Sequence, residues 1–99
     1  MRGAEISVDR PTRRIRVRDV EARVSPRQFE LFVCLAERRE RWVHSDEIIA
    51  IVCGTHHERS TSLVRVQVHG LRKSLGAARE SIRCDGHRGY MLTLALTAK

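Results

Sequence analysis

The stretch TSLVRVQVHGLRKSL, Thr61 to Leu75, is compatible with a strand and with a helix. Val64, Val66 and Val68 alternate with polar residues, which is typical of a half-buried strand. A different apolar set recurs at the helical spacing i, i+4, i+7 and i+11: Val64, Val68, Leu71 and Leu75. The two interpretations differ in where they place Val66, which a helix would leave outside its apolar face.

The length and the C-terminal end of this stretch favour the helix. The stretch is longer than an ordinary strand. Arg72 and Lys73 lie in its last turn, and Gly76 follows it, as is common where a helix ends. The sequence therefore predicts a helix over residues 61–75.

Two more helices are predicted before it. The first follows Ser25, which forms the capping-box pattern with Gln28. Its apolar stripe runs at i, i+3, i+4 and i+7: Phe29, Phe32, Val33 and Ala36. The second is expected in HSDEIIAIVCG, residues 44–54, with Ser45 as its N-cap and Gly54 at its end.

Both ends of the chain have the alternation of strands. Residues 5–24 hold three short patterns that predict antiparallel strands: Ile6 and Val8, Ile15 and Val17, then Val20, Ala22 and Val24. Residues 81–95 predict a β-hairpin around the turn DGHRG at 85–89. Its alternating residues are Ile82 and Cys84 before the turn, and Tyr90, Leu92 and Leu94 after it.

The order of these elements predicts an α+β fold in one domain, residues 1–99. N-terminal antiparallel strands (5–24) precede three helices (25–76), and a hairpin (81–95) ends the order. Two helices joined by a loop and followed by a hairpin form a winged helix-turn-helix.

The charge of the chain indicates its class of partner. Nineteen Lys and Arg oppose twelve Asp and Glu, a net charge of +7, which favours a polyanion. A solvated basic surface is the alternative. The chain has no apolar run long enough to span a membrane and no signal-peptide pattern at MRGAEISVDR, so a cytoplasmic protein is expected. An odd number of cysteines, three, makes a disulfide framework unexpected.

Three motifs in this order resemble the DNA-binding effector domain of OmpR/PhoB-type response regulators. They are VSPRQFELFVCLAERRERWVHSDEII at 24–49, LVRVQVHGLRKSLG at 63–76 and HRGYML at 87–92, and the likeness covers about residues 6–94. Arg65, Gln67 and Gly70 replace the Asp, His and Arg usual in the family's recognition helix. Cys53 and His87 replace its Trp before the loop glycine and its first wing glycine. These departures concern the operator sequence rather than the fold.

The resemblance implies a bacterial transcriptional regulator, cytoplasmic and nucleoid-associated, that binds double-stranded DNA sequence-specifically. The helix 61–75 would enter the major groove, and the wing 85–89 would lie at the minor groove. No enzymatic activity, cofactor or small-molecule substrate is implied. The sequence leaves open a receiver domain, a homodimer on DNA and contact with RNA polymerase. The loop for that last contact would be Thr55, His56, His57, Glu58 and Arg59.

A projection at 100° per residue identifies candidate DNA contacts. The helix offers Ser62, Arg65, Val66, Gln67, His69, Gly70, Arg72 and Lys73, and the wing offers His87 and Arg88. Arg65 can bind guanine or a phosphate, Gln67 an adenine or a backbone oxygen, and Val66 can pack on a thymine methyl group. An arginine at the wing can enter a narrow minor groove. The plain alternatives are a surface valine for Val66 and a solvated turn for the wing. Gly70 would allow close approach to the duplex or to another helix, and its plain alternative is the loss of an arginine contact by drift.

Other functions remain as alternatives. Cys53, His56, His57 and Glu58 have ligand types suited to zinc, but without paired metal-ligand spacing. The sequence has no phosphate loop, GxSxG or HExxH motif, so no enzyme and no metal are expected. Too few aromatic residues are present for a single-stranded RNA surface. A winged helix that contacts RNA polymerase or another protein, without reading DNA, is the main rival.

Overall fold

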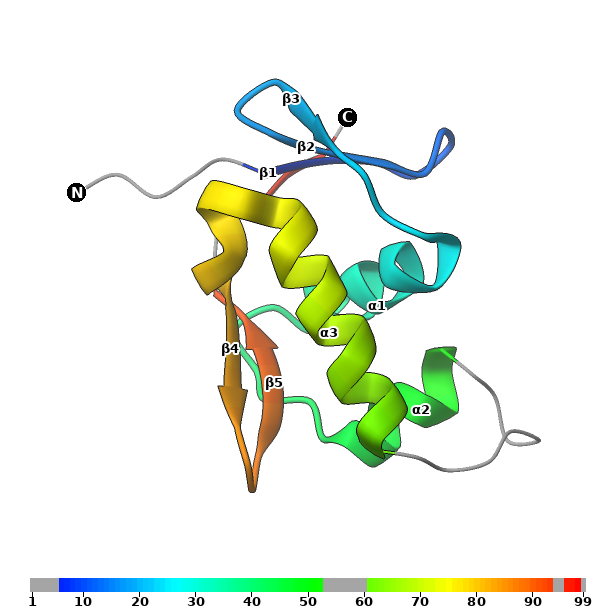
Figure 1. Ribbon diagram of the computed structural model, residues 1–99, viewed down its shortest axis with the longest axis vertical. Coiled ribbons are helices and arrows are strands. Elements are labelled where there is room, and N and C mark those ends of the chain that lie inside the picture. The colour runs from blue at the N-terminus through cyan, green and yellow to red at the C-terminus, as the bar shows by residue number, and fades with distance from the viewer. Residues whose placement is uncertain (1–5, 53–60, 94–95, 99) are drawn as a thin grey trace.

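The computed structural model describes residues 6–52, 61–93 and 96–98. The elements in chain order are β1 (Ile6–Asp9), β2 (Arg14–Val17), β3 (Val20–Ala22), α1 (Pro26–Glu37), α2 (Ser45–Val52), α3 (Thr61–Leu75), the 3₁₀ helix η1 (Gly76–Ser81), β4 (Ile82–Asp85), β5 (Gly89–Leu92) and β6 (Leu96–Ala98) (Figure 1). The sheet lies at one end of the molecule, and the hairpin β4–β5 runs beside α3. The predicted order of strands, three helices and wing hairpin is confirmed.

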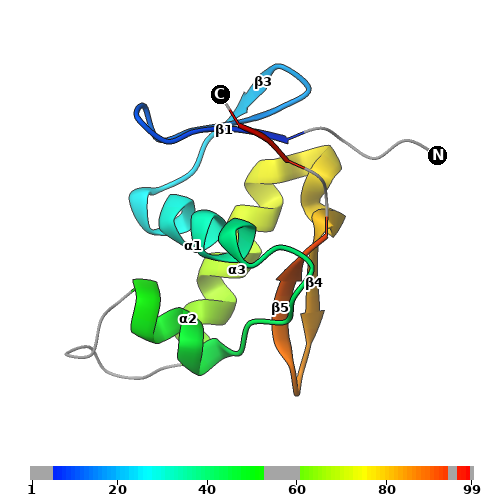
Figure 2. The same cartoon turned by 180° about the vertical axis from the view of Figure 1, so that it is seen from behind.

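The N-terminal sheet has the strand order β3-β2-β1-β6. β1, β2 and β3 are antiparallel, as predicted, and the β2–β3 turn uses Arg18 and Asp19, both with positive φ. Two consecutive positive φ values are typical of the type I′ turn that suits the twist of a hairpin. β6 adds a parallel strand beside β1, with Ile6 opposite Leu96 (Figure 2).

The end of the wing differs from the prediction. The sequence indicated a hairpin through residue 95, whereas β5 ends at Leu92, and Leu94 lies outside the described residues. Thr93 donates its backbone N–H to the Ser81 carbonyl, 2.9 Å away. Alternating apolar residues continue past Leu92, so periodicity alone does not separate the wing from the strand that returns to the sheet.

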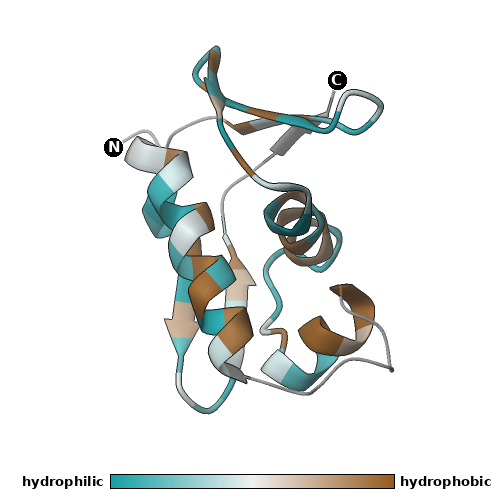
Figure 3. Cartoon of the chain, turned by 45° about the vertical axis from the view of Figure 1, so that its right-hand side comes forward, coloured by the Kyte–Doolittle hydropathy of each residue, from teal (hydrophilic) through white to brown (hydrophobic). Residues whose placement is uncertain are grey.

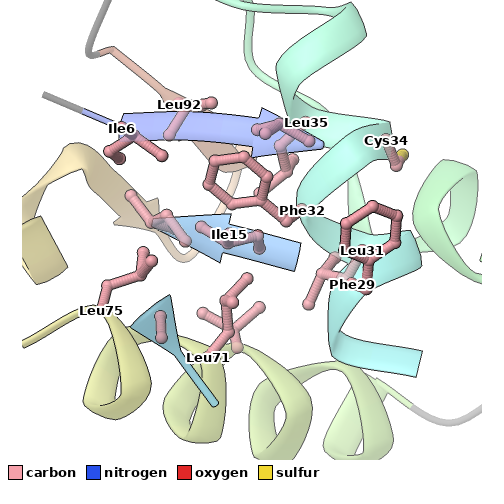
Figure 4. Packing of buried hydrophobic residues seen from close by; sticks show 14 of the residues in the cluster. Ile6, Ile15, Phe29, Leu31, Phe32, Cys34, Leu35, Leu71, Leu75 and Leu92 are labelled. Atoms are coloured by element: carbon pink, nitrogen blue, oxygen red, sulfur yellow. The ribbon is translucent and has the colours of Figure 1, made fainter. Parts of the chain in front are cut away.

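α1 is the central helix of the core. Its N-terminus has the predicted capping box, with Gln28 N to Ser25 Oγ and Ser25 N to Gln28 Oε1 both at 3.1 Å. Phe29 and Phe32 are buried as expected, and so are Leu31, Cys34 and Leu35, while Val33 and Ala36 of the predicted stripe are half-buried. α1 buries a wider face than one stripe because the sheet packs on one side and α2 and α3 on the other (Figures 2 and 4).

α3 presents the predicted apolar seam to the core. The four seam residues are all buried: Val64, Val68, Leu71 and Leu75. Figure 4 shows Leu71 and Leu75 pointing toward Phe32 of α1 and Ile15 of the sheet. Figure 3 shows hydrophobic and hydrophilic residues mixed along α3, while α2 is largely hydrophobic. The helical interpretation of residues 61–75 is therefore correct.

The N-terminus of α2 corrects the cap expected from the sequence. The helix begins at Ser45, and the residue before it, His44, accepts the Asp46 N–H through Nδ1 at 3.2 Å. His44 also accepts the Ile48 N–H through its carbonyl at 3.0 Å. The N-cap is thus His44 and not Ser45. The N–H groups of the first helical turn have no acceptor within the helix, and the His44 imidazole accepts one of them, that of Asp46. Gly54, the predicted end, lies outside the described residues.

Candidate nucleic-acid interface

The face of α3 opposite its seam is exposed to solvent. Val66 is 64% exposed, although it lies between two buried valines of the seam. The exposed polar residues around it are Ser62, Arg65, His69 and Lys73. Five of the residues predicted from the sequence therefore share one open face, and a single apolar side chain lies among three cationic or titratable ones.

A groove of about 440 Å³ separates this helix from the wing. Its lining comes from three parts of the chain: His44, Ser45, Arg65, Val68, His69, Arg72, Cys84, Asp85, Gly86, Gly89 and Tyr90. The sequence did not indicate His44, Ser45 or Tyr90, because no local pattern links the start of α2 to a wing strand. Arg65 and His69 thus line this groove and are also exposed to solvent.

Two backbone hydrogen bonds fix the wing at the side of this groove. Val43 N donates to Tyr90 O at 2.7 Å, and Tyr90 N donates to Val43 O at 2.9 Å. Gly89 permits this approach, because it has φ +107° and an added Cβ would lie 2.0 Å from Val43 O. Val43 therefore forms an isolated antiparallel β-bridge with Tyr90, at the side of the two-stranded wing.

The turn at the wing tip is organised by one carboxylate. Asp85 Oδ1 accepts the backbone N–H of His87 at 2.8 Å and that of Arg88 at 3.2 Å. These two bonds, with His87 first, hold the pKa of Asp85 below its ordinary value. The predicted wing residues His87 and Arg88 are both exposed.

Arg65 of α3 also interacts with Tyr90 of β5. Burial raises the pKa of the Tyr90 phenol, and the nearby Cys84 acts in the same direction. Arg65 opposes this, through its positive charge and as a side-chain hydrogen-bond partner of Tyr90. The Arg65 side chain of α3 thus acts on the Tyr90 phenol of the wing across the groove.

Arg72 has structural partners. Its Nε donates to the Arg79 carbonyl at 3.1 Å, and its Nη1 lies 3.9 Å from Cys84 Sγ. Arg79 belongs to η1 and Cys84 to β4, so the guanidinium holds the base of the wing to α3. Lys73, the neighbouring predicted contact, is exposed. The two cations therefore do not have the same environment.

Gln67 and Gly70 lie toward the protein. A Cβ at position 70 would lie 2.5 Å from Gln28 Nε2 of α1. Gln67 is half-buried and lines a small apolar hollow together with Leu31 of α1 and Ile49 of α2. Of the interpretations of Gly70, close approach to another helix is the one that the packing supports.

Several predicted residues lie outside the described part of the chain. They are Cys53 and the loop Thr55, His56, His57, Glu58 and Arg59. Within residues 6–52, 61–93 and 96–98, no three His, Cys, Asp or Glu side chains gather as metal ligands. Cys34 is buried and Cys84 exposed, both as free thiols, and burial raises the pKa of Cys34. None of the helices in those ranges is long and apolar enough to cross a membrane.

Comparison with known proteins agrees with this geometry. The family described as "Transcriptional regulatory protein, C terminal" matches residues 19–92. No curated protein matches the sequence.

Solved structures with the same fold include three DNA-binding domains. That of Bacillus subtilis CssR has a TM-score of 0.78 at 16% identity and covers 89% of this chain and 99% of its own. That of Klebsiella pneumoniae RstA, in complex with the RstA box, has a TM-score of 0.80 at 18% identity and covers 94% and 95%. That of E. coli CadC has a TM-score of 0.73 at 25% identity and covers 84% and 80%.

Proposed function

Because this chain belongs to the family of transcriptional regulatory protein C-terminal domains, the non-enzymatic DNA-binding domains of OmpR/PhoB-type regulators, we propose that it reads double-stranded DNA with α3 in the major groove and the wing at the minor groove. The observation that carries this proposal is the exposed face of α3. Val66 stands there among Arg65, His69 and Lys73, beside a wing that is fixed to the body of the domain.

The chemistry of that face suits the major groove. Arg65 supplies a planar fork that can bind guanine O6 and N7, and Val66 supplies an apolar surface for a thymine methyl group. Ser62, His69 and Lys73 supply donors to phosphates and base edges. Gln67 and Gly70 face α1 and α2 and are left out of the proposed surface. Arg72 supports the wing and adds positive charge beside the groove.

The wing tip supplies His87 and Arg88. The exposed guanidinium of Arg88 suits the negative potential of a narrow, A·T-rich minor groove. By family analogy, the loop of residues 55–59 would contact RNA polymerase, and two copies would bind adjacent half-sites in the cytoplasm.

Selection of bound duplexes from a random pool, followed by titration at several salt concentrations, tests the proposal. Each phosphate neutralised contributes about −0.9 to the slope of log K against log salt. Lys73→Ala should weaken binding to every duplex. It should also make the slope less negative by about 0.9, the contribution of one phosphate contact.

Arg16→Ala is the matched control. Arg16 is an exposed cation on β2, between the buried Ile15 and Val17, and belongs to neither α3 nor the wing. It should leave both affinity and slope unchanged. Equal effects of the two variants, or no salt-dependent duplex binding by the wild type, would favour a protein-interaction module instead.

A further inference from the structure

Arg88 at the wing tip lies over an aromatic ring from a distant segment. Its guanidinium carbon is 5.9 Å from the ring centroid of Trp42, which is half-buried in the connection between α1 and α2. A cation at this distance from the face of an indole is attracted by the negative face of the ring. The contact joins the exposed tip of the wing to the body of the domain.

The segment that carries Trp42 is itself bonded to the wing on both sides of the indole. Before it, Glu40 N donates to Leu92 O at 2.9 Å, and after it, Val43 exchanges two hydrogen bonds with Tyr90. Gly89 makes this close approach possible. The ring and strand β5 therefore hold a defined relation to each other.

The backbone of Arg88 is fixed as well. Its N–H donates to Asp85 Oδ1 at 3.2 Å, which sets the turn from which the side chain leaves. A free arginine side chain samples many rotamers and loses that freedom when it binds. The Arg88 side chain is already held by the turn at its backbone and by the indole at its guanidinium. It therefore loses less conformational entropy when it binds.

We propose that Trp42 is a positioning residue for the wing and holds the Arg88 guanidinium at the wing tip, ready for a narrow minor groove. This inference rests on the proposed function of the wing. Trp42 need not touch DNA, and it acts through Arg88.

The contact can first be tested without DNA, because Trp42 is the single tryptophan of the chain. Arg88→Ala should change the tryptophan fluorescence of the free protein. Arg83→Ala removes an exposed arginine from strand β4 of the same wing and should leave the emission unchanged. Equal spectra for the wild type and Arg88→Ala would overturn the contact.

The role in binding requires a double-mutant cycle on a duplex with an A-tract at the wing position. Trp42→Leu should weaken binding about 2- to 5-fold, the range expected for an exposed cation–aromatic pair. Trp42→Phe, which keeps a ring, should retain most of the affinity. In an Arg88→Ala background, Trp42→Leu should cost nothing further.

The other outcomes separate the rival roles. The same loss in both backgrounds would make Trp42 a structural or direct contact, and tighter binding by Trp42→Leu would mean that the ring keeps Arg88 away from DNA. Either result overturns the positioning role. If Trp42→Leu melts far below the wild type, the cycle with Trp42→His decides in its place. A wild-type protein without affinity for any duplex would instead overturn the proposed function, whatever the fluorescence shows.

Discussion

Gly70 of α3 lies against the side-chain amide of Gln28 in α1, so closely that a β-carbon at position 70 would stand 2.5 Å from Gln28 Nε2. The same amide group forms the capping box of α1 through Oε1. A glycine in the middle of a helix lowers helix stability, and here it allows the N-terminus of α1 to pack on α3 without disturbing its own cap.

This contact predicts a specific double-mutant cycle. Gly70→Ala should change the free energy of unfolding by less than about 0.5 kcal/mol, because a helix-propensity gain of about 1 kcal/mol is offset by displacement of the capping amide. In a Gln28→Ala background nothing opposes the gain, and Gly70→Ala should stabilise by about 1 kcal/mol. Urea denaturation of the four proteins measures this. The same change in both backgrounds would show that the two residues are not coupled.

Gly89 and Gly76 form a matched pair for the wing. Both have positive φ, +107° and +57°, but an added Cβ at Gly76 meets open space, whereas at Gly89 it meets the carbonyl of Val43. Gly76→Ala should cost about 1–2 kcal/mol, the penalty of a left-handed residue. Gly89→Ala should cost at least about 3 kcal/mol, because strain adds to the loss of the Val43 hydrogen bonds. Thermal melting distinguishes them, and equal losses would argue against a fixed wing.

Val66→Ala tests the reading face of α3. If Val66 packs on a thymine methyl group, the change should weaken the preferred site by roughly 1–2 kcal/mol, with little loss on random duplex and no change in salt slope. Uracil in place of that thymine should weaken the wild type similarly and affect Val66→Ala little. Val20→Ala is the control, since Val20 is 68% exposed on the sheet. A loss of unfolding free energy with unchanged site preference would mean that α3 presents another face.

Tyr90 gives a pH-dependent prediction, because it is the single tyrosine of the chain. Burial raises its pKa and Arg65 lowers it, so Arg65→Ala should raise the pKa further, as measured by the ultraviolet absorbance of the phenolate. Lys73→Ala should not. A phenol with a raised folded pKa contributes stability that is complete below about pH 10 and lost as pH rises through the folded value. An unchanged or lower pKa in Arg65→Ala would place Arg65 away from Tyr90.

The sequence by itself determined the elements whose signals are local. The capping box of Ser25 and Gln28 and the apolar seam of residues 61–75 depend on spacings of three and four residues. Such spacings are set by the helical repeat, which neighbouring residues impose on one another wherever the helix lies. The same repeat places Val66 on the outside of the helix, whatever element packs against the seam.

Tertiary structure alone decided what each exposed or half-exposed side chain meets. Strand β6 pairs with β1 from the other end of the chain, Arg72 bonds η1 and β4, and Gly70 faces α1. Likewise, only the bonded approach of Val43 to Tyr90 brings Trp42 near Arg88. These contacts join residues far apart in sequence, whose relative positions follow from how whole elements pack. The position of a residue in the helical or strand repeat therefore fixes the side of the element on which it lies. The residue that it contacts depends on which other element packs against that side.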